Sequence, residues 1–370
     1  MFQRSLLRWY SKHKRDLPWR KTRDPYKIMV SEFMLQQTRI ETALPYYDRF
    51  LNVFPTLPDL ARASIQKVLK LWEGMGYYAR AHNLHAAAKR ISNELGGKIP
   101  SKKSELLLLP GFGPYTAGAV ASIAFNETTA ALDGNVKRVL SRLAGIHGPI
   151  SPLQQKRRLE GIGEDLIPPG KASDFNQALM DLGALICLPL RPKCSSCPVR
   201  NSCSFLKIGP QPRNRQERKQ RKEDWLVGVI EKEGRLLLHQ KEGKGLLSGL
   251  WQFPTLVFPE NARPSQKRKG RKNEDILRKS MQENFGIKIK FRKALPPLQH
   301  SFTHIQATMK PYLFSLLQDV PTQTLPTHAR WIRFSSLSRY PISRAMAKVS
   351  NLLSTLDSQG IIEEQKIMVS

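Results

Sequence analysis

Acidic residues are scarce in this 370-residue chain, where 30 Asp and Glu stand against 60 Lys and Arg and the formal net charge is +30. Such an excess of positive charge suits a polyanionic partner, and nucleic acid fits better than an anionic membrane. Hydrophobic residues still make up 40% of the chain, which excludes global disorder. The length fits two domains better than one.

Long apolar runs are also missing. No stretch approaches the ~20 apolar residues that cross a bilayer. The first residues, MFQRSLLRWYSKHKR, have neither the apolar core nor the small-residue cleavage site of a secretory signal. We therefore expect a soluble monomer in the cytoplasm, associated with the nucleoid of a bacterium and with no membrane partner.

Cysteine is rare, and the four that occur share one segment, Cys187-x6-Cys194-x2-Cys197-x5-Cys203. In a reducing cytosol a compact group of thiols indicates a metal centre more often than disulfides. Four thiolates can bind zinc or a [4Fe–4S] cluster, and zinc modules usually pair two C-x2-C knuckles, whereas this segment has one. The pattern favours the cluster and keeps zinc as an alternative. With all four ligands from the protein, the role of the metal centre is expected to be structural.

The chain divides into parts with different patterns. Residues 1–206 repeat apolar positions every three or four residues, which predicts an all-α region. Residues 207–224 are rich in Pro, Arg, Lys and Gln and predict a basic linker. Residues 225–350 predict an α+β domain, with two strands around a Glu-Gly turn in WLVGVIEKEGRLLLHQK and one helix in EDILRKSMQENFGI. Residues 351–370 are expected to form a tail that is partly an ordered helix.

A glycine-rich turn lies in LPGFGPYTAGAV, residues 109–120, just before a helix that begins near Pro114. Backbone amides at such a turn and helix N-terminus can bind an anion. The segment resembles the hairpin of the helix-hairpin-helix (HhH) motif, which holds DNA phosphate without reading sequence. By this resemblance the backbone contacts come from Leu109, Gly111 and Gly113. Asp133 follows in ALDGNVKRV, and the hairpin, the Asp and the four cysteines in this order form a specific combination.

This combination resembles the MutY family of adenine DNA glycosylases, within the endonuclease III superfamily, over nearly the whole chain. The cysteine spacing is that of the superfamily and implies a structural [4Fe–4S] cluster. The resemblance implies a multi-domain fold, in which a six-helix lobe and a cluster lobe form an all-α HhH glycosylase and an α+β Nudix-like domain follows. The implied reaction hydrolyses the N-glycosidic bond of adenine mispaired with 8-oxoguanine or guanine in double-stranded DNA, and leaves an abasic site.

The resemblance assigns the chemistry to two carboxylates. Glu32, in SEFMLQQT, is implied to protonate the adenine ring, so it must keep its proton near neutral pH in an apolar site. Asp133 is implied to stay ionised and to stabilise the sugar cation or attack its anomeric carbon. Tyr115 and Asn135 match positions that hydrogen-bond around this pair. Outside these motifs, Glu32 would be a solvated helix residue and Asp133 a helix cap.

Other matched positions concern the bases. The segment DLPWR resembles the wall of the adenine pocket, although a tryptophan there could equally be a core residue. Flipping a base out of the duplex leaves a gap that side chains must fill, and an aromatic ring has the stacking face for this role. The implied pocket residues are Leu17, Trp19 and Arg20, with Asp181 as a weaker member, and the implied wedge residues are Gln36 and Tyr77.

The C-terminal half carries two further resemblances. GLWQFP, residues 249–254, matches a sheet segment of the Nudix-like domain. Phe302, Thr303 and His304 lie where the family usually has Phe-Ser-His, in the loop that contacts the oxidised base. Threonine keeps the hydroxyl group of serine and adds a methyl group, so Thr303 is expected to contact the base.

Nucleotide hydrolysis by this domain is not expected. Nudix chemistry needs several Glu side chains on one helix to hold magnesium. In RKSMQENFGI the corresponding positions keep Glu283 but are otherwise Lys279, Ser280 and Asn284. The domain is therefore expected to recognise a base and not to be a second enzyme.

Two other functions stay open at this stage. A bifunctional pyrimidine glycosylase and lyase of the endonuclease III type has a Lys nucleophile at the position of Tyr115, and without an amine the Schiff base cannot form in the same way. That enzyme also lacks the counterpart of Glu32. A non-catalytic HhH DNA-binding protein is the second alternative, and the presence of Glu32, Asp133 and a pocket segment together opposes it.

Overall fold

The computed structural model describes residues 1–146, 152–208, 220–243, 245–259, 272–317 and 325–357. Its chain forms two compact units. The first contains Met1–Ala63 and Arg80–Asn214, and the second contains Ser64–Ala79 and Arg215–Ser370. Most of the expected linker, residues 209–219, lies outside the described residues.

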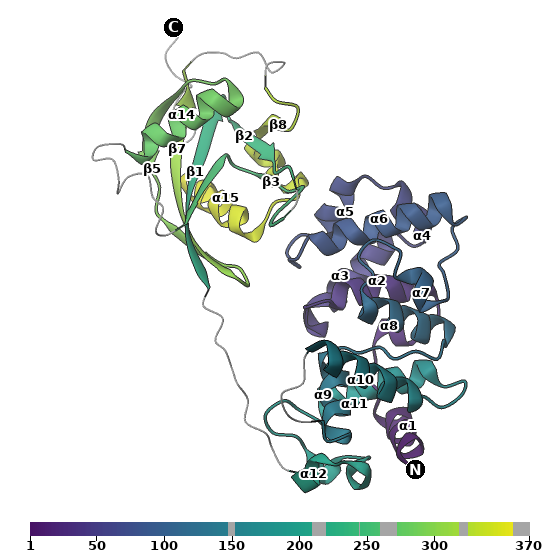
Figure 1. The fold of residues 1–370 in the computed structure, drawn as a ribbon. Coiled ribbons are helices and arrows are strands. Elements are labelled where there is room, and N and C mark those ends of the chain that lie inside the picture. The colour runs from purple at the N-terminus through teal and green to yellow at the C-terminus, as the bar shows by residue number, and fades with distance from the viewer. Residues whose placement is uncertain (147–151, 209–219, 244, 260–271, 318–324, 358–370) are drawn as a thin grey trace. The chain divides into compact units, whose positions relative to one another are not determined.

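The first unit is helical throughout its described part, as the sequence predicted (Figure 1). Its helices are α1 (Phe2–His13), α2 (Pro25–Leu35), α3 (Ile40–Val53), α4 (Leu57–Arg62), α6 (Ala79–Glu94), α7 (Lys103–Leu106), α8 (Pro114–Phe125), α9 (Gly134–Leu143), α10 (Pro152–Asp165), α11 (Ala172–Leu185) and α12 (Phe205–Ile208).

Helices α2 and α8 pack against each other at the centre of this unit. Asp24 caps α2 by accepting hydrogen bonds from the amides of Tyr26 and Lys27, and Pro25 occupies the first helical position, where its missing N–H costs nothing. Helix α8 begins with Pro114 and ends at Asn126 in the left-handed conformation. Both helices are buried nearly all round, so a polar side chain on either one lies in the interior.

The second unit is built on one sheet with the strand order β3-β2-β1-β7-β5, as expected for an α+β domain. Strand β4 also pairs with β1, β6 with β7, and β8 with β2. The strands are β1 (Arg221–Lys232), β2 (Arg235–Gln240), β3 (Trp251–Gln252), β4 (Thr255–Pro259), β5 (Ile289–Ala294), β6 (Leu298–Ser301), β7 (Ile305–Leu316) and β8 (Ala329–Arg333), and the helices are α5 (Ile65–Trp72), α14 (Asn273–Phe285) and α15 (Arg344–Asp357).

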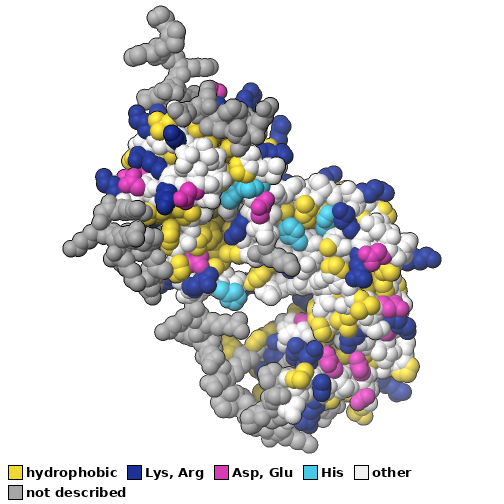
Figure 2. All heavy atoms as spheres, turned by 45° about the horizontal axis from the view of Figure 1, so that its top comes forward, with side chains coloured by type: hydrophobic (Ala, Val, Ile, Leu, Met, Phe, Trp, Pro, Cys, Tyr) yellow, Lys and Arg dark blue, Asp and Glu magenta, His cyan; other side chains and the backbone are white. Residues whose placement is uncertain are grey.

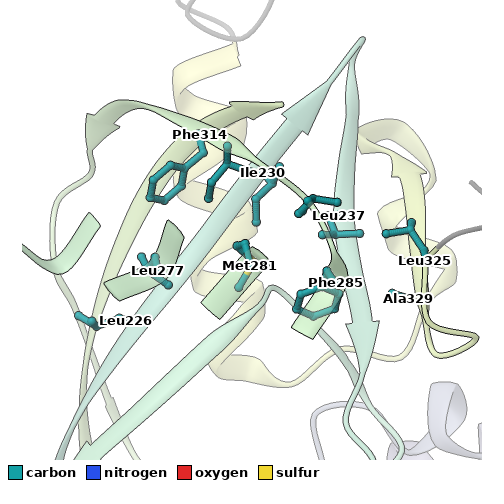
Figure 3. Packing of buried hydrophobic residues seen from close by; sticks show 11 residues of the cluster. Leu226, Ile230, Leu237, Leu277, Met281, Phe285, Phe314, Leu325 and Ala329 are labelled. Atoms are coloured by element: carbon teal, nitrogen blue, oxygen red, sulfur yellow. The ribbon is translucent and has the colours of Figure 1, made fainter. Parts of the chain in front are cut away.

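Local sequence explains the main features of this sheet. Glu233 and Gly234 have φ values of 49° and 70°, which is the two-residue turn that the right-handed twist of a hairpin prefers, and the predicted Glu-Gly turn is confirmed. The predicted helix is α14, which ends at Gly286 in the left-handed conformation. Its apolar face meets the sheet, where Met281, Phe285 and Leu237 point toward one another (Figure 3).

Two expectations about boundaries were wrong. Strand β1 begins at Arg221, inside the segment expected to be linker, because it pairs in parallel with β7 from Arg221 opposite Ile305 onward. Helix α15 runs to Asp357, past the expected start of the tail at residue 351. Ser64–Ala79 was expected to belong to the helical half. Its helix α5 is present as expected, and the contacts of the segment group it with the second compact unit.

Hydrogen bonds explain the place of Ser64–Ala79 in the second unit. Helix α5 presents Gln66 and Lys70, and Glu73 follows at its C-terminal end. Each of these side chains binds a loop or strand of the sheet domain at 2.9–3.2 Å. The pairs are Gln66 with Gly249 and Trp251, Lys70 with Tyr340, and Glu73 with Ile342.

Candidate active site

A cavity of about 620 Å³ lies in the first unit and gathers most of the side chains singled out from the sequence. They come from a 3₁₀ turn at Pro18–Arg20, from α2, from the turn before α8, from α8 itself and from the start of α9. The expected residues that line it are Leu17, Trp19, Arg20, Glu32, Gln36, Gly111, Gly113, Tyr115, Asp133 and Asn135.

Glu32 is a buried acid on α2, with only 4% of its surface exposed. The hydroxyl of Tyr115, on α8, donates a hydrogen bond of 2.7 Å to its Oε2 atom. Burial disfavours the charged carboxylate and raises the pKa of Glu32 to about 7, although the hydrogen bond from Tyr115 and the charge of Arg20 work in the opposite direction. At neutral pH this carboxyl group can therefore hold a proton and release it.

Asp133 caps a helix and also lines the cavity. It is the N-cap of α9, where Oδ1 accepts a hydrogen bond of 2.6 Å from the amide of Val136. Its other oxygen, Oδ2, accepts a bond of 3.0 Å from the side chain of Asn135. Burial raises the pKa of Asp133, while these hydrogen bonds lower it. The helix cap thus also fixes the direction of a carboxylate that lines the cavity.

Asn135 is held in turn by a residue that the sequence did not single out. Arg138 donates to Oδ1 of Asn135 at 2.7 Å and to the carbonyl of Cys187 at 2.8 Å. Arg138 also donates to the carbonyl of Gly183. Gly183 packs closely against Asn135, because a Cβ atom on this glycine would lie 2.6 Å from Cβ of Asn135. The spacing of three residues from Asn135 along a helix was the available signal for Arg138. Asp133 and the first cysteine are therefore joined by a chain of hydrogen bonds.

Asp181 has a different place from the one expected. It does not line the cavity, and its fully buried carboxylate binds the guanidinium groups of Arg15 and Arg20. Arg15 donates to Oδ1 at 2.7 Å, and Arg20 donates to the same oxygen at 2.6 Å. Asp181 thereby orients Arg20, which does line the cavity.

Trp19 is both a buried core residue and part of the cavity lining. Its ring is 6% exposed and packs edge-on against Tyr47 at 5.1 Å between ring centroids. The same side chain lines the cavity beside Leu17. Gln36 lines the cavity too, and its side chain donates to the hydroxyl of Thr116 at 2.9 Å.

The turn between α7 and α8 requires glycine at Gly111. This residue has a φ of 76°, and a Cβ atom there would lie 2.5 Å from Cβ of Asn83 and 2.8 Å from Phe33. Gly113 is the N-cap of α8, and a Cβ atom there would meet nothing within 4 Å. Leu109 is buried beneath the turn, whereas Leu108 is 70% exposed. The turn is thus anchored from below and leaves the N-terminus of α8 open at Gly113.

The four cysteines lie together after α11 as free thiols. They line one small cavity, with Arg142, Lys193 and Arg200 as basic neighbours. Arg142 donates to the sulfur of Cys187 at 3.1 Å and to the carbonyl of Leu188 at 2.8 Å. Positive charge around the cavity would offset the charge of four thiolates.

A second cavity, of about 610 Å³, lies in the second unit. Phe302, Thr303 and His304 line it, together with Leu246 from the loop before β3. Tyr77, which does not line the first cavity, lines this one and shares a hydrogen bond with the hydroxyl of Thr303. Tyr77 has a positive φ of 50°, and so do Gly74 and Gly76, which precede it in the same turn.

Known proteins resemble both halves of the chain. The model of the HhH-GPD superfamily of base excision DNA repair proteins matches residues 30–164, and the NUDIX domain model matches residues 226–352. The human adenine DNA glycosylase is 36% identical over 94% of this chain and 73% of its own length. The chain belongs to the adenine DNA glycosylase family.

Other relatives agree with this membership of the adenine DNA glycosylase family. The adenine DNA glycosylase of Buchnera aphidicola subsp. Baizongia pistaciae is 33% identical over 84% of this chain and 85% of its own length. Among solved structures, a thermostable thymine-DNA glycosylase is 33% identical with a TM-score of 0.51, over 56% of this chain and 96% of that one. The expected fold, an HhH glycosylase followed by a Nudix-like domain, is confirmed. Among the described helices, none has the length and apolar character needed to cross a membrane.

Proposed function

We propose that this protein hydrolyses the N-glycosidic bond of adenine mispaired with 8-oxoguanine or guanine in duplex DNA and leaves an abasic site. The observation that carries the proposal is the pairing of Glu32 and Asp133 in one cavity. Glu32 is a buried acid with a pKa of about 7, and Asp133 has its orientation fixed by a helix cap. The cavity volume of about 620 Å³ is typical of a small-molecule site and can take a purine base.

The two carboxyl groups divide the reaction between them. Glu32 donates its proton to the adenine ring, which makes the base a better leaving group. Asp133, ionised and held by Val136 and Asn135, stabilises the positive charge that develops on the sugar or bonds transiently to the anomeric carbon. Water then completes the hydrolysis. Tyr115 keeps Glu32 in place through its hydrogen bond.

A lyase reaction is less well supported than simple hydrolysis. A lyase of the endonuclease III type needs an amine in the site to form a Schiff base with the sugar. None of the described residues that line the cavity is a lysine, and the position expected for that amine is Tyr115, whose hydroxyl is engaged with Glu32.

DNA binding is supported by charge and by the hairpin. The formal net charge of +30 favours binding to a polyanion such as the phosphate backbone. Figure 2 shows Lys and Arg side chains spread over the face in view, without a single basic patch. The open N-terminus of α8 at Gly113 offers backbone amides to one phosphate. We propose that Gln36 and Tyr77 fill the gap left by the flipped base.

Recognition of the opposite base is proposed for the second cavity. Thr303 and His304 bring a hydroxyl and an imidazole to it, which can hydrogen-bond to an oxidised purine. On α14, the helix that would carry a Nudix metal site, the side chains at the metal-binding positions bind one another. Lys279 and Glu283 form an ion pair at 3.5 Å, and Asn284 donates to the hydroxyl of Ser280 at 2.9 Å. This placement supports a recognition domain over a hydrolase.

We further propose that the four cysteines hold a structural [4Fe–4S] cluster. All four line one cavity with basic neighbours. Zinc modules usually pair two C-x2-C knuckles, whereas this segment has one, so the cysteine pattern favours a multi-iron cluster. Such a cluster would supply a cross-link between the segments around Cys187 and Cys203 and no chemistry at the adenine site.

The test uses three duplexes that carry adenine opposite 8-oxoguanine, guanine or thymine. The proposed enzyme excises adenine from the first two and leaves sites that alkali cleaves. Cleavage without alkali would instead identify a lyase, and binding without base release would identify a DNA-binding protein. The variant Glu32→Gln is the control, since it keeps the shape of the site and removes the acidic proton.

A further inference from the structure

One face of β1 carries a row of connected side chains. Arg221, Glu223 and Trp225 alternate along the strand and therefore point to the same side of the sheet. Arg221 and Glu223 form an ion pair at 2.5 Å, and the other carboxylate oxygen of Glu223 accepts a hydrogen bond of 2.9 Å from Nε1 of Trp225. Glu223 is only 6% exposed and Trp225 only 3%, so the indole has a fixed orientation.

The indole of Trp225 stacks on the ring of Phe302, with 5.3 Å between ring centroids and an angle of 28° between the planes. On the same ring of Phe302, His300 packs edge-on at 4.5 Å. Stacked and edge-to-face contacts are the two favourable geometries for aromatic pairs. Two aromatic neighbours therefore hold Phe302, the first residue of the loop that continues with Thr303 and His304.

The backbone of this loop is held by the start of the same strand. The side chain of Gln220 donates to the carbonyl of Phe302 at 2.9 Å, and the amide of Arg221 donates to the carbonyl of His304 at 2.9 Å. The amide of Phe302 donates to the carbonyl of Ile305 at 2.7 Å and closes the turn. Backbone and ring contacts together hold the main chain of the loop, from which the side chains of Thr303 and His304 line the second cavity and Thr303 shares a hydrogen bond with Tyr77.

We propose that Trp225 is a specificity-determining positioning residue, which holds Phe302 beneath the loop so that Thr303 and His304 face the base opposite adenine. This inference rests on the proposed recognition of 8-oxoguanine by that loop. Phe302 then serves as an anchor between Trp225 and His300 and does not stack on DNA. Glu223 contributes by keeping the indole in one orientation, although it lies outside the second cavity.

Two substitutions of Trp225 separate the effect of its stacking on Phe302 from that of its hydrogen bond to Glu223. Trp225→Leu removes the stacked ring, and Trp225→Phe keeps a ring but loses the hydrogen bond to Glu223. The measurement is the single-turnover excision rate of adenine opposite 8-oxoguanine, divided by the rate opposite guanine, in the full-length protein. We expect Trp225→Leu to lower this ratio about tenfold, which corresponds to about 1.4 kcal/mol. Trp225→Phe and Glu223→Gln should lower it less, and the rate opposite guanine should hardly change.

Trp331→Leu is the matched control. Trp331 lies on β8 of the same sheet, packs against the domain core and does not line the second cavity. Its substitution should destabilise the domain, as melting experiments would show, and leave the ratio unchanged. An equal fall of the ratio in Trp331→Leu and Trp225→Leu would overturn the positioning role, because general destabilisation would then explain both.

The outcomes distinguish this inference from the proposed function. If the unmodified protein releases no adenine from any duplex, the proposed function fails. If it excises adenine and prefers 8-oxoguanine, but both folded Trp225 variants keep the full preference, the positioning role alone fails. If Trp225→Leu does not fold, a double-mutant cycle of Trp225→Phe and Phe302→Leu decides. Coupled residues give a double variant whose fall in the ratio is smaller than the product of the two single falls. A fall equal to that product would overturn the positioning role.

Discussion

The hydroxyl of Tyr115 donates a hydrogen bond of 2.7 Å to Oε2 of Glu32 in the interior of the helical unit. Burial and the charge of Glu32 raise the pKa of Tyr115 well above its usual value, so the tyrosine stays protonated and remains the donor. A donor favours the charged form of the carboxylate. Tyr115 therefore limits how far burial can raise the pKa of Glu32.

The pH dependence of excision tests this relationship. Glu32 must be protonated, so the rate should fall as pH rises through about 7, and Asp133 must be ionised, so it should fall again at low pH. Tyr115→Phe removes a hydrogen bond that lowers the pKa of Glu32, so the alkaline limb should move to higher pH by about one unit. A profile of single-turnover rates measures both limbs. A shift to lower pH would contradict the assigned direction of the bond.

Stability should depend on pH through the same group. The pKa of Glu32 rises from 4.5 to about 7 on folding, so between these values the folded protein binds more protons than the unfolded chain. Its contribution to the free energy of unfolding is then present below pH 4.5 and is lost as pH rises to 7, by about 3 kcal/mol at most. Glu32→Gln should abolish excision and remove this part of the slope. Denaturant unfolding of both proteins at pH 5 and pH 8 provides the comparison.

The hairpin glycines make a matched pair for a stability test. Gly111→Ala places a Cβ atom 2.5 Å from Asn83 at a residue whose φ is 76°, so it should lower the free energy of unfolding by about 2–4 kcal/mol. Gly113→Ala meets no atom within 4 Å and should cost less than about 1 kcal/mol. Equal losses in the two variants would show that the space around Gly111 is not the limiting factor.

Loss of one cysteine should act on folding and not on proton transfer. Cys197→Ser leaves three thiolates in the cavity that all four cysteines line, so iron content and soluble yield should both fall. The remaining folded fraction should keep the alkaline limb of the pH profile, because Glu32 lies in a separate cavity. Iron analysis is the decisive measurement, and full iron occupancy in Cys197→Ser would rule out four-cysteine ligation.

Removal of the second domain should leave adenine excision in place and remove the preference for 8-oxoguanine over guanine opposite the adenine. A chain that ends at Phe205 keeps every residue of the first cavity, so it should excise adenine slowly and at similar rates opposite 8-oxoguanine and guanine. In the full chain, Thr303→Ala with His304→Ala should have a similar effect, at about 1 kcal/mol for each lost hydrogen bond. If the double variant loses equally on both duplexes, the loop is scaffold and selectivity comes from the helical half.

The sequence predicted those parts of the site that local motifs contain. Glu32 and Asp133 lie in recognisable segments, and the structure places both in one cavity. The hairpin could be predicted because a proline and two glycines, at Pro110, Gly111 and Gly113, favour a tight turn directly before a helix. The helical and sheet-forming halves followed from the periodicity of their apolar residues.

Residues that act across long separations in the chain escaped prediction. Arg15 and Arg138 owe their roles to Asp181 and Cys187, partners that only the folded chain brings to them. The family resemblance gave Asp181 a place beside the substrate, and nothing in its own segment shows that two arginines bind its carboxylate. Trp225 was treated as the first residue of a domain, and its stacking on Phe302 depends on strand pairing between β1 and β7.

Side chains of helix α5, and of Glu73 directly after it, bind mostly main-chain groups of the sheet domain. Gln66, Lys70 and Glu73 reach carbonyl or amide groups of Gly249, Tyr340 and Ile342, and Trp251 adds the one side-chain bond of this set. Main-chain groups are the same whatever residue supplies them. The three polar residues on α5 and at its end are therefore constrained by this contact, whereas on the sheet side only the indole of Trp251 is required by its own hydrogen bond. Among descendants of this gene, divergence should accumulate unequally on the two sides of that contact.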